Sequence, residues 1–237
     1  MNLVWQLEQV QVRFGRRVAL APLTLQIHAG ESVALVGANG SGKSTLLRLL
    51  HGVFLPSAGV ITTGVGIAQA MVFQHPFMLR TSALNNVALA LWLRGHRWRQ
   101  AKNLAALALA RVGLQAQSVQ SARTLSGGQQ QKLALARAWA QGPQVLLLDE
   151  PTASLDPHAK REVEQLMGDF MADARAEPLT MVFASHNLGQ VKRLATRVIY
   201  LEQGRVLADL PVDEFFDVDV LRAASPAAHL FVKGERI

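Results

Sequence analysis

The stretch Gly37–Thr45, GANGSGKST, has residue types and spacing that could hold a phosphate chain. It matches the pattern G-x-x-x-x-G-K-[ST] and lies between a predicted strand at 32–36 and a predicted helix, which is the context that the pattern requires. Glycines let backbone N–H groups surround a β-phosphate, Lys43 can neutralise β- and γ-phosphate oxygens, and the Ser44 hydroxyl can bind Mg²⁺. We expect nucleotide contacts from Gly37, Asn39, Gly40, Gly42, Lys43, Ser44 and Thr45.

Two carboxylates follow an apolar run in VLLLDE, at Asp149 and Glu150. Parallel α/β sheets place their ligands at the carboxyl ends of strands, so these side chains should lie at the same edge as the phosphate loop. Asp149 fits a Mg²⁺ role, directly or through water, and Glu150 fits a base that orients an attacking water. Phosphoryl transfer needs mainly positioning and charge compensation, which these residues can supply.

A second stretch, TLSGGQQQK at Thr124–Lys132, reads as a Ser-Gly-Gly turn that opens a helix. Bare N–H groups at a helix N-terminus also form an anion site. One chain of modest length therefore has two candidate phosphate sites, which calls for an explanation.

The elements around these motifs predict an α/β fold. Nearly continuous apolar strands alternate with helices, a pattern typical of a mostly parallel sheet buried on both faces. Apolar residues roughly alternate over Leu3–Phe14, which predicts an antiparallel edge strand. Between these parts the pattern changes to Ala- and Leu-rich helices. We expect one domain over 1–237, with an α/β core at about 1–75 and 140–237 and a helical subdomain at about 76–139.

Composition excludes several other classes. The chain has 237 residues, is half apolar and contains no cysteine, so disulfides and thiolate metal sites are excluded. Residues 51–79 lack Lys, Arg, Asp and Glu, but Gly, Pro and polar residues interrupt them, so we predict strands and loops rather than a membrane span. The net charge is +7 and the basic residues are scattered, which favours a solvated face over a nucleic-acid patch.

The order of the motifs resembles that of the nucleotide-binding subunit of an ATP-binding cassette (ABC) transporter. The phosphate loop, Gln74 in MVFQHP, LSGGQ, LLLDEP, SLD and His186 in ASHN follow one another over almost the whole chain. The LSGGQ phrase is much more specific than a phosphate loop alone. The resemblance implies the fold of a P-loop NTPase, ATP and Mg²⁺ as cofactors, and ATP hydrolysis as the activity.

The resemblance also explains the two phosphate sites. In similar proteins two subunits face each other head to tail, and each ATP lies between the phosphate loop of one subunit and the Ser-Gly-Gly helix of the other. Phe14 then lies where the family stacks an aromatic ring on adenine, and Asp156 where it signals across the dimer. Gln74 resembles the glutamine that touches Mg²⁺ and the attacking water, and His186 the histidine that contacts the γ-phosphate. The residues implied for the partner's ATP are Ser126, Gly127, Gly128 and Gln129.

The resemblance further implies a homodimer bound to an integral-membrane permease at the cytoplasmic face of the inner membrane, served indirectly by an extracytoplasmic substrate-binding protein and without a nucleic-acid partner. The short HPFMLRTSALNNV after Gln74 and the phrase SHNLGQ resemble oxyanion importers, tungstate first and phosphate second. The few residues after VDEFFDV favour a cassette without the regulatory β-domain that sugar, molybdate and sulfate importers often add. Another small-solute importer remains an alternative, as does an ATPase driving lipoprotein release or cell division.

Overall fold

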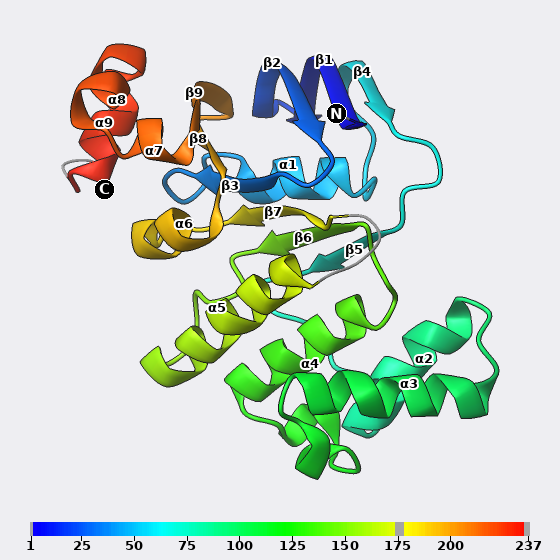
Figure 1. Cartoon of the computed structure of the whole chain (residues 1–237). Coiled ribbons are helices and arrows are strands. Elements are labelled where there is room, and N and C mark those ends of the chain that lie inside the picture. Colours follow the sequence, from blue (N-terminus) through cyan, green and yellow to red (C-terminus); the bar gives the residue numbers. More distant parts are fainter. Residues whose placement is uncertain (1, 174–177, 235–237) are drawn as a thin grey trace.

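The computed structural model describes residues 2–173 and 178–234, and Figure 1 shows their arrangement. The central sheet has the strand order β5-β6-β7-β3-β8-β9. Its strands are β3 (Ser32–Val36), β5 (Gln69–Val72), β6 (Val145–Asp149), β7 (Thr180–Ala184), β8 (Arg197–Glu202) and β9 (Arg205–Pro211). All neighbouring pairs are parallel except β8 and β9. Every residue of β3, β6 and β7 is buried, as a sheet covered on both faces requires, and the predicted fold class is confirmed.

A second, three-stranded sheet is antiparallel, with the order β2-β1-β4. Its strands are β1 (Leu3–Phe14), β2 (Arg17–His28) and β4 (Ala58–Thr63). The prediction of an edge strand at Leu3–Phe14 is wrong, because β1 is the middle strand. Its alternation reflects one buried face, including Trp5 and Leu7, and a buried face does not distinguish a middle strand from an edge strand.

Helix α1 (Lys43–Leu50) lies between the two sheets (Figure 1). Leu46, Leu47, Leu49 and Leu50 pack into one apolar cluster with residues of both sheets. The helix follows the phosphate loop directly and ends near Gly52, whose φ of 78° is the left-handed conformation common just after a helix. Packing between two sheets therefore fixes the position and direction of the helix N-terminus.

The remaining helices form the other layers. Figure 1 shows α2 (Ala83–Leu93), α3 (Trp98–Arg111) and α4 (Gly127–Trp139) as a lobe inserted between β5 and β6. Short 3₁₀ turns at Gln115–Gln117 and Ala122–Thr124 connect α3 to α4. Helices α5 (Pro157–Ala172) and α6 (Leu188–Leu194) join α4 in the second large apolar cluster. The chain then continues through α7 (Val212–Phe215), α8 (Val218–Ala224) and α9 (Pro226–Val232).

The helical lobe is attached to the core through α4. The Trp139 and Phe170 rings stack with centroids 4.2 Å apart, which joins the end of α4 to α5. In the described parts of the chain, no helix combines the length and the apolar character that a bilayer crossing requires.

Candidate functional site

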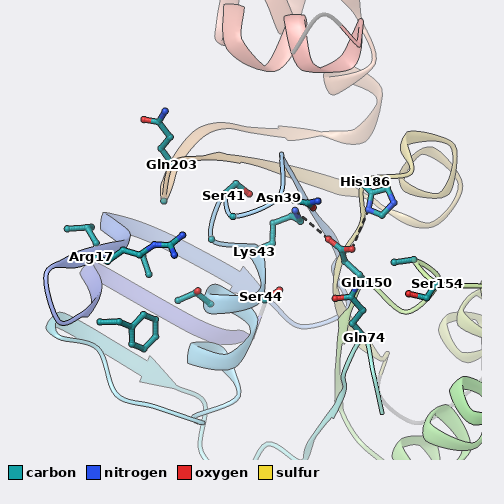
Figure 2. Close-up of a pocket in the computed structure, with 18 residues that line it drawn as sticks. Arg17, Asn39, Ser41, Lys43, Ser44, Gln74, Glu150, Ser154, His186 and Gln203 are labelled. Carbon is teal, nitrogen blue, oxygen red and sulfur yellow. Dashed lines mark ion pairs between the residues drawn. The ribbon is translucent and has the colours of Figure 1, made fainter. Parts of the chain in front are cut away.

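A cleft of about 890 Å³ opens beside the N-terminus of α1 (Figure 2). The turn between β1 and β2 forms one wall, the phosphate loop forms the floor, and the segments after β5, β6 and β7 form the opposite wall. Most of the predicted nucleotide residues line it, namely Phe14, Asn39, Gly40, Gly42, Lys43, Ser44, Thr45, Gln74, Glu150 and His186. Segments far apart in the sequence thus meet at one site.

The phosphate loop has a backbone that only glycine fits well. Gly42, the N-cap of α1, has a φ of 111°, and a Cβ there would lie 2.8 Å from Leu20 Cδ2 and 3.0 Å from the Ala19 carbonyl oxygen. The first N–H groups of an α-helix have no intrahelical partner, so the N-terminus of α1 presents free donors to the cleft. The helix dipole adds positive potential there, and this arrangement suits an anion.

Lys43 is buried, and its charge is held in place by three groups. Its ammonium donates to the carbonyl oxygens of Gly37 at 2.8 Å and Ala38 at 3.2 Å, and it lies 3.5 Å from Glu150 Oε1. A buried cation needs such compensation. Phosphate oxygens in the cleft could take the place of any of these acceptors.

Asp149 lies under the loop, almost completely buried at 2% exposure. Ser44 Oγ donates to Asp149 Oδ1 at 2.6 Å, and Arg48 lies 3.6 Å from Asp149 Oδ2. The structure thus brings together Ser44 and Asp149, the two residues to which the sequence assigned a Mg²⁺ role, although they are far apart in the sequence.

Glu150 links the two halves of the cleft. Its Oε1 faces Lys43, and its Oε2 lies 3.4 Å from His186 Nδ1, as the dashed lines in Figure 2 show. Glu150 has a φ of 47°, a region that non-glycine residues visit rarely and often at functional sites. Gln74 lies on the same wall (Figure 2). A carboxylate, an imidazole and an amide thus surround the space beyond Lys43, where they could orient a water.

Phe14 stands on the opposite wall, half exposed to the cleft. Its ring meets that of Phe54 edge to face at 5.5 Å between centroids, which leaves a ring face for a ligand. Because the phosphate loop lies on the same cleft, a planar base against Phe14 and a phosphate chain over α1 could belong to one molecule.

The Ser-Gly-Gly turn lies outside this cleft. Ser126 and Gln129 form a reciprocal capping box at the start of α4: Ser126 Oγ accepts from the Gln129 N–H at 3.3 Å, and Gln129 Oε1 accepts from the Ser126 N–H at 3.0 Å. A Cβ on Gly128 would lie 2.6 Å from Ala159 Cβ, whereas one on Gly127 would meet nothing within 4 Å. The turn is thus capped, packed on one side and open on the other.

Asp156 is also separate from the cleft. It caps α5, since its Oδ1 accepts the N–H groups of His158 at 2.9 Å and Ala159 at 3.0 Å. The hydrogen bonds from the Ala159 and His158 N–H groups lower the pKa of this carboxyl, with the Ala159 bond the largest cause. The structure thus gives Asp156 a local role in forming the helix.

Sequence reasoning missed several residues at the site. Arg48 follows Ser44 by four positions on α1, so helical spacing could have indicated that it shares a face with Ser44. Arg17 lines the cleft from the β1–β2 turn, and Ser154 and Gln203 line it from loops. No motif marks Arg17 or Gln203, and Ser154 belongs to the SLD motif although no contact in the cleft was expected of it. Only the packing of the two sheets and the loops brings these residues to the cleft.

The residues present fit Mg²⁺ as well as a nucleotide. Mg²⁺ prefers hard oxygen ligands and is usually held by one or two carboxylates together with substrate phosphates. The Ser44 hydroxyl and the Asp149 carboxylate supply such oxygens side by side, and Gln74 lines the same cleft. Within residues 2–173 and 178–234 no group of three His, Cys, Asp or Glu that could hold a metal is found.

Comparisons with known proteins found similar chains. The family model described as ABC transporter matches residues 20–153. The chain is 38% identical over 234 residues to the methionine import ATP-binding protein MetN of Caulobacter vibrioides, covering 92% of this chain and 68% of that protein. It is 38% identical over 237 residues to the phosphonates import ATP-binding protein PhnC 1 of Pseudomonas aeruginosa, covering 88% and 84%.

A solved structure is also similar to this chain. The ATP-binding cassette MJ0796, in a dimeric post-hydrolysis state bound to ADP and Pi, has a TM-score of 0.77 and 27% identity to this chain. The match covers 88% of this chain and 98% of that one.

Proposed function

The chain belongs to the ABC transporter family and is an ATPase, and from this premise we propose that two copies drive an integral-membrane permease that imports a small solute. The observation that carries the proposal is the division of the phosphate-binding features. The loop at Gly37–Thr45 and the Ser126 turn belong to one chain but do not share a cleft. A second copy is needed to bring both features to one ATP.

In the proposed reaction, Phe14 stacks on the adenine and the phosphate loop binds the phosphate chain, with Lys43 against the β- and γ-phosphate oxygens. Ser44 and Asp149 would hold Mg²⁺ with Gln74 nearby, and the ion would supply positive charge against the phosphate oxygens. Glu150 accepts a proton from the attacking water and orients it. His186, beside Glu150, contacts the γ-phosphate. The short distances among Lys43, Glu150 and His186 support these roles.

The partner copy completes the site in this proposal. Its Ser126 turn brings the free N–H groups at the start of α4 to the γ-phosphate. Asp156 takes the signalling role across the dimer that the family resemblance implies. Gly127 supports this role because nothing lies within 4 Å of the position of its missing Cβ. ATP would then hold the two copies together, and hydrolysis would release them.

Replacing Glu150 by Gln tests the assignment of the base. The amide keeps the shape of the side chain but cannot accept the proton, so E150Q should bind ATP and hydrolyse it about 100- to 10,000-fold more slowly. The trapped ATP should also hold two copies together, which light scattering can measure. Hydrolysis by E150Q at the native rate would show that Glu150 is not the base.

The proposed permease contact involves the surface after Gln74. Residues 74–84 lead from the cleft to α2, so a change at the γ-phosphate could move this surface. Phe77 on this segment is exposed, and its carbonyl oxygen accepts from Arg137 on α4, which links the segment to the helical lobe. The chain would thereby be a peripheral subunit at the cytoplasmic face of the membrane, with an extracytoplasmic binding protein as an indirect partner.

For the cargo, we infer an oxyanion, with tungstate first and phosphate second. The support is the short segment after Gln74 and the SHNLGQ phrase. The names of the relatives point to several cargos: PhnC 1 is named for phosphonates, which carry a tetrahedral oxyanion group, whereas MetN is named for methionine. Membership in the family is therefore compatible with several cargos, and the oxyanion cargo is a narrower proposal.

Purification from the native membrane in mild detergent tests partner and cargo together. A permease that co-purifies with this chain, together with a binding protein that retains tungstate, molybdate or phosphate, is the expected result. A binding protein that holds an amino acid would overturn the oxyanion cargo and leave import standing. A membrane partner with a large extracytoplasmic domain and no binding protein would instead indicate lipoprotein release or cell division.

A further inference from the structure

The helical lobe carries the excess positive charge of the whole chain. Residues 32–148 contain no Asp or Glu, and residues 76–139 contain nine Lys and Arg. The net charge of the whole chain is +7, so the part outside the lobe is slightly acidic. Because every charge in the lobe has one sign, its surface attracts anions over a distance of about a Debye length.

Four of these cations gather in one turn, which we call the α2–α3 turn and define as residues 92–102. Arg94, Arg97, Arg99 and Lys102 are all exposed there, and none of them forms an ion pair within the described residues. The Arg94 guanidinium donates to the Gln141 carbonyl oxygen at 3.1 Å, and Lys102 lies 5.6 Å from the centroid of the Trp98 ring. These contacts leave the positive charges uncompensated by any carboxylate.

Large apolar side chains are interleaved with these cations. Trp92, Leu93 and Trp98 are 51%, 72% and 41% exposed. The chain reverses within this turn, because Gly95 donates its N–H to Trp92 O and His96 donates to Leu91 O. The two tryptophans and the arginines therefore lie close together in the chain, around the reversal between α2 and α3.

We propose that the α2–α3 turn binds the surface of an anionic lipid bilayer. Tryptophan favours the interface of a membrane, where the indole lies at the level of the headgroups. Arg and Lys near an anionic leaflet each add about 1 kcal/mol of attraction. Water solvates the apolar part of the exposed indoles poorly, whereas a headgroup layer accepts both the indoles and the guanidinium groups.

The position of the turn agrees with this role. Figure 1 shows the connection between α2 and α3 at the outer edge of the helical lobe, on the side away from α5 and α6. None of the cleft residues belongs to residues 92–102, so lipid and nucleotide can bind at the same time. The inference adds a direct lipid contact to the proposed function, and protein-free vesicles test it without any permease or cargo.

The experiment compares the binding of the purified chain to phosphatidylcholine vesicles with and without phosphatidylglycerol. We expect sedimentation with the anionic vesicles only, weakened by added salt. Neutralising two cations in R97Q/R99Q should reduce the affinity about 25-fold. The matched variant R161Q/R222Q removes two exposed arginines elsewhere and should bind as the native chain does. Both variants should keep the native ATPase rate in solution.

The tryptophans supply a second readout. Trp5 and Trp139 are buried, so a change in emission on adding vesicles should come from Trp92 and Trp98. Anionic vesicles should shift this emission to the blue, brominated lipid should quench it, and W92F/W98F should abolish both effects. Equal binding to neutral and anionic vesicles, or equal loss in the two arginine variants, would overturn the proposal. So would binding of single-stranded nucleic acid at this turn without any vesicle binding.

Discussion

Lys43 and Glu150 form a pair whose geometry suits a reaction at phosphate. Lys43 is buried and is fixed by two carbonyl oxygens of its own loop as well as by Glu150. Groups that are fixed before the substrate arrives need little reorganisation in the transition state. Glu150 also has a left-handed φ, a conformation that persists only where the surrounding structure supports it, and it follows β6, whose Val145 and Leu147 are buried in an apolar cluster.

Gly42 in the phosphate loop is expected to tolerate no side chain without a loss of stability. In G42A the new Cβ would overlap Leu20 Cδ2 at 2.8 Å in a backbone with a φ of 111°. The overlap and the positive φ together should lower the free energy of unfolding by about 2–4 kcal/mol. Urea unfolding measures this, and nucleotide binding should weaken in parallel because the N-terminus of α1 must shift.

Gly52 provides the matched control. It also has a positive φ, 78°, but a Cβ there would meet nothing within 4 Å. G52A should therefore lower the free energy of unfolding only by the cost of the positive φ, about 1 kcal/mol. It should bind nucleotide as the native chain does. If G42A were no less stable than G52A, the close approach to Leu20 would have no energetic importance.

At the scale of elements, the two glycines that open α4 have different tasks. Gly128 lets α4 approach α5, because a Cβ would lie 2.6 Å from Ala159 Cβ, while Gly127 faces open space. G128A should lower the free energy of unfolding by about 1–3 kcal/mol, by overpacking the helix contact.

G127A should leave stability unchanged or slightly raised, because Ala favours a helix over Gly. It should nevertheless reduce ATPase activity, since the added methyl group would stand where the partner's phosphate is proposed to bind. Thermal unfolding and ATPase assays on both variants separate packing from binding. A G127A enzyme with full activity would contradict the proposed place of Gly127 in the shared site.

The cap of α5 should make stability depend on pH in a defined direction. Hydrogen bonds from the Ala159 and His158 N–H groups lower the pKa of Asp156 from its ordinary 3.8. A carboxyl with a lowered folded pKa contributes stability that is present above its unfolded pKa and lost as the pH falls through the folded pKa. The native chain should lose this contribution below about pH 4.

Replacement of Asp156 by Asn tests this pH dependence. Asn still caps a helix, but it cannot be protonated in this range, so D156N should lack that acid-dependent loss. Urea unfolding near neutral pH and near pH 3 measures the difference. D169N removes one negative charge from the same helix away from its cap and serves as the control. An unchanged acid sensitivity in D156N would rule out the cap as its source.

Local sequence patterns predicted where each element lies in the chain better than which elements pack beside it. Runs of buried apolar residues indicated β3, β6 and β7, and a linear motif indicated the phosphate loop, because in each case the signal lies in consecutive residues. The place of β1 in the middle of its sheet depends on pairing with β4, which follows α1 in the sequence, and nothing within Leu3–Phe14 indicates that pairing. Arg17 escaped prediction for the same reason.

At the scale of the whole molecule, one chain separates two features that the chemistry needs together. The cleft is built on the phosphate loop and the ends of the central strands, whereas the Ser126 turn belongs to the helical lobe. A smaller cavity that includes Gln74, Gly127 and Ser154 lies between the cleft and this turn. Gln74 and Ser154 line both cavities, so a partner that covers Gly127 would also reach the wall beside Glu150.

Mixing two defective chains tests whether the ATP sites are shared. K43A should be unable to hold the phosphates in its own cleft, and S126R should block only the site it offers to a partner. In a head-to-tail pair of one K43A and one S126R chain, one site carries both defects and the other carries neither. The mixture should therefore form an ATP-dependent heterodimer with a single bound nucleotide, detectable by native mass spectrometry.

Neither variant alone should form a stable ATP-bound dimer, although S126R should still bind ATP as a monomer because its own cleft is intact. Thermal unfolding of S126R shows whether the loss of the Ser126 cap has damaged the fold, and S126A, which removes the same cap without the bulk, provides the comparison. Absence of the heterodimer, with both variants folded, would mean that each chain builds its ATP site alone. The Ser126 turn would then be only the capped start of α4, and the head-to-tail pairing would have to be abandoned.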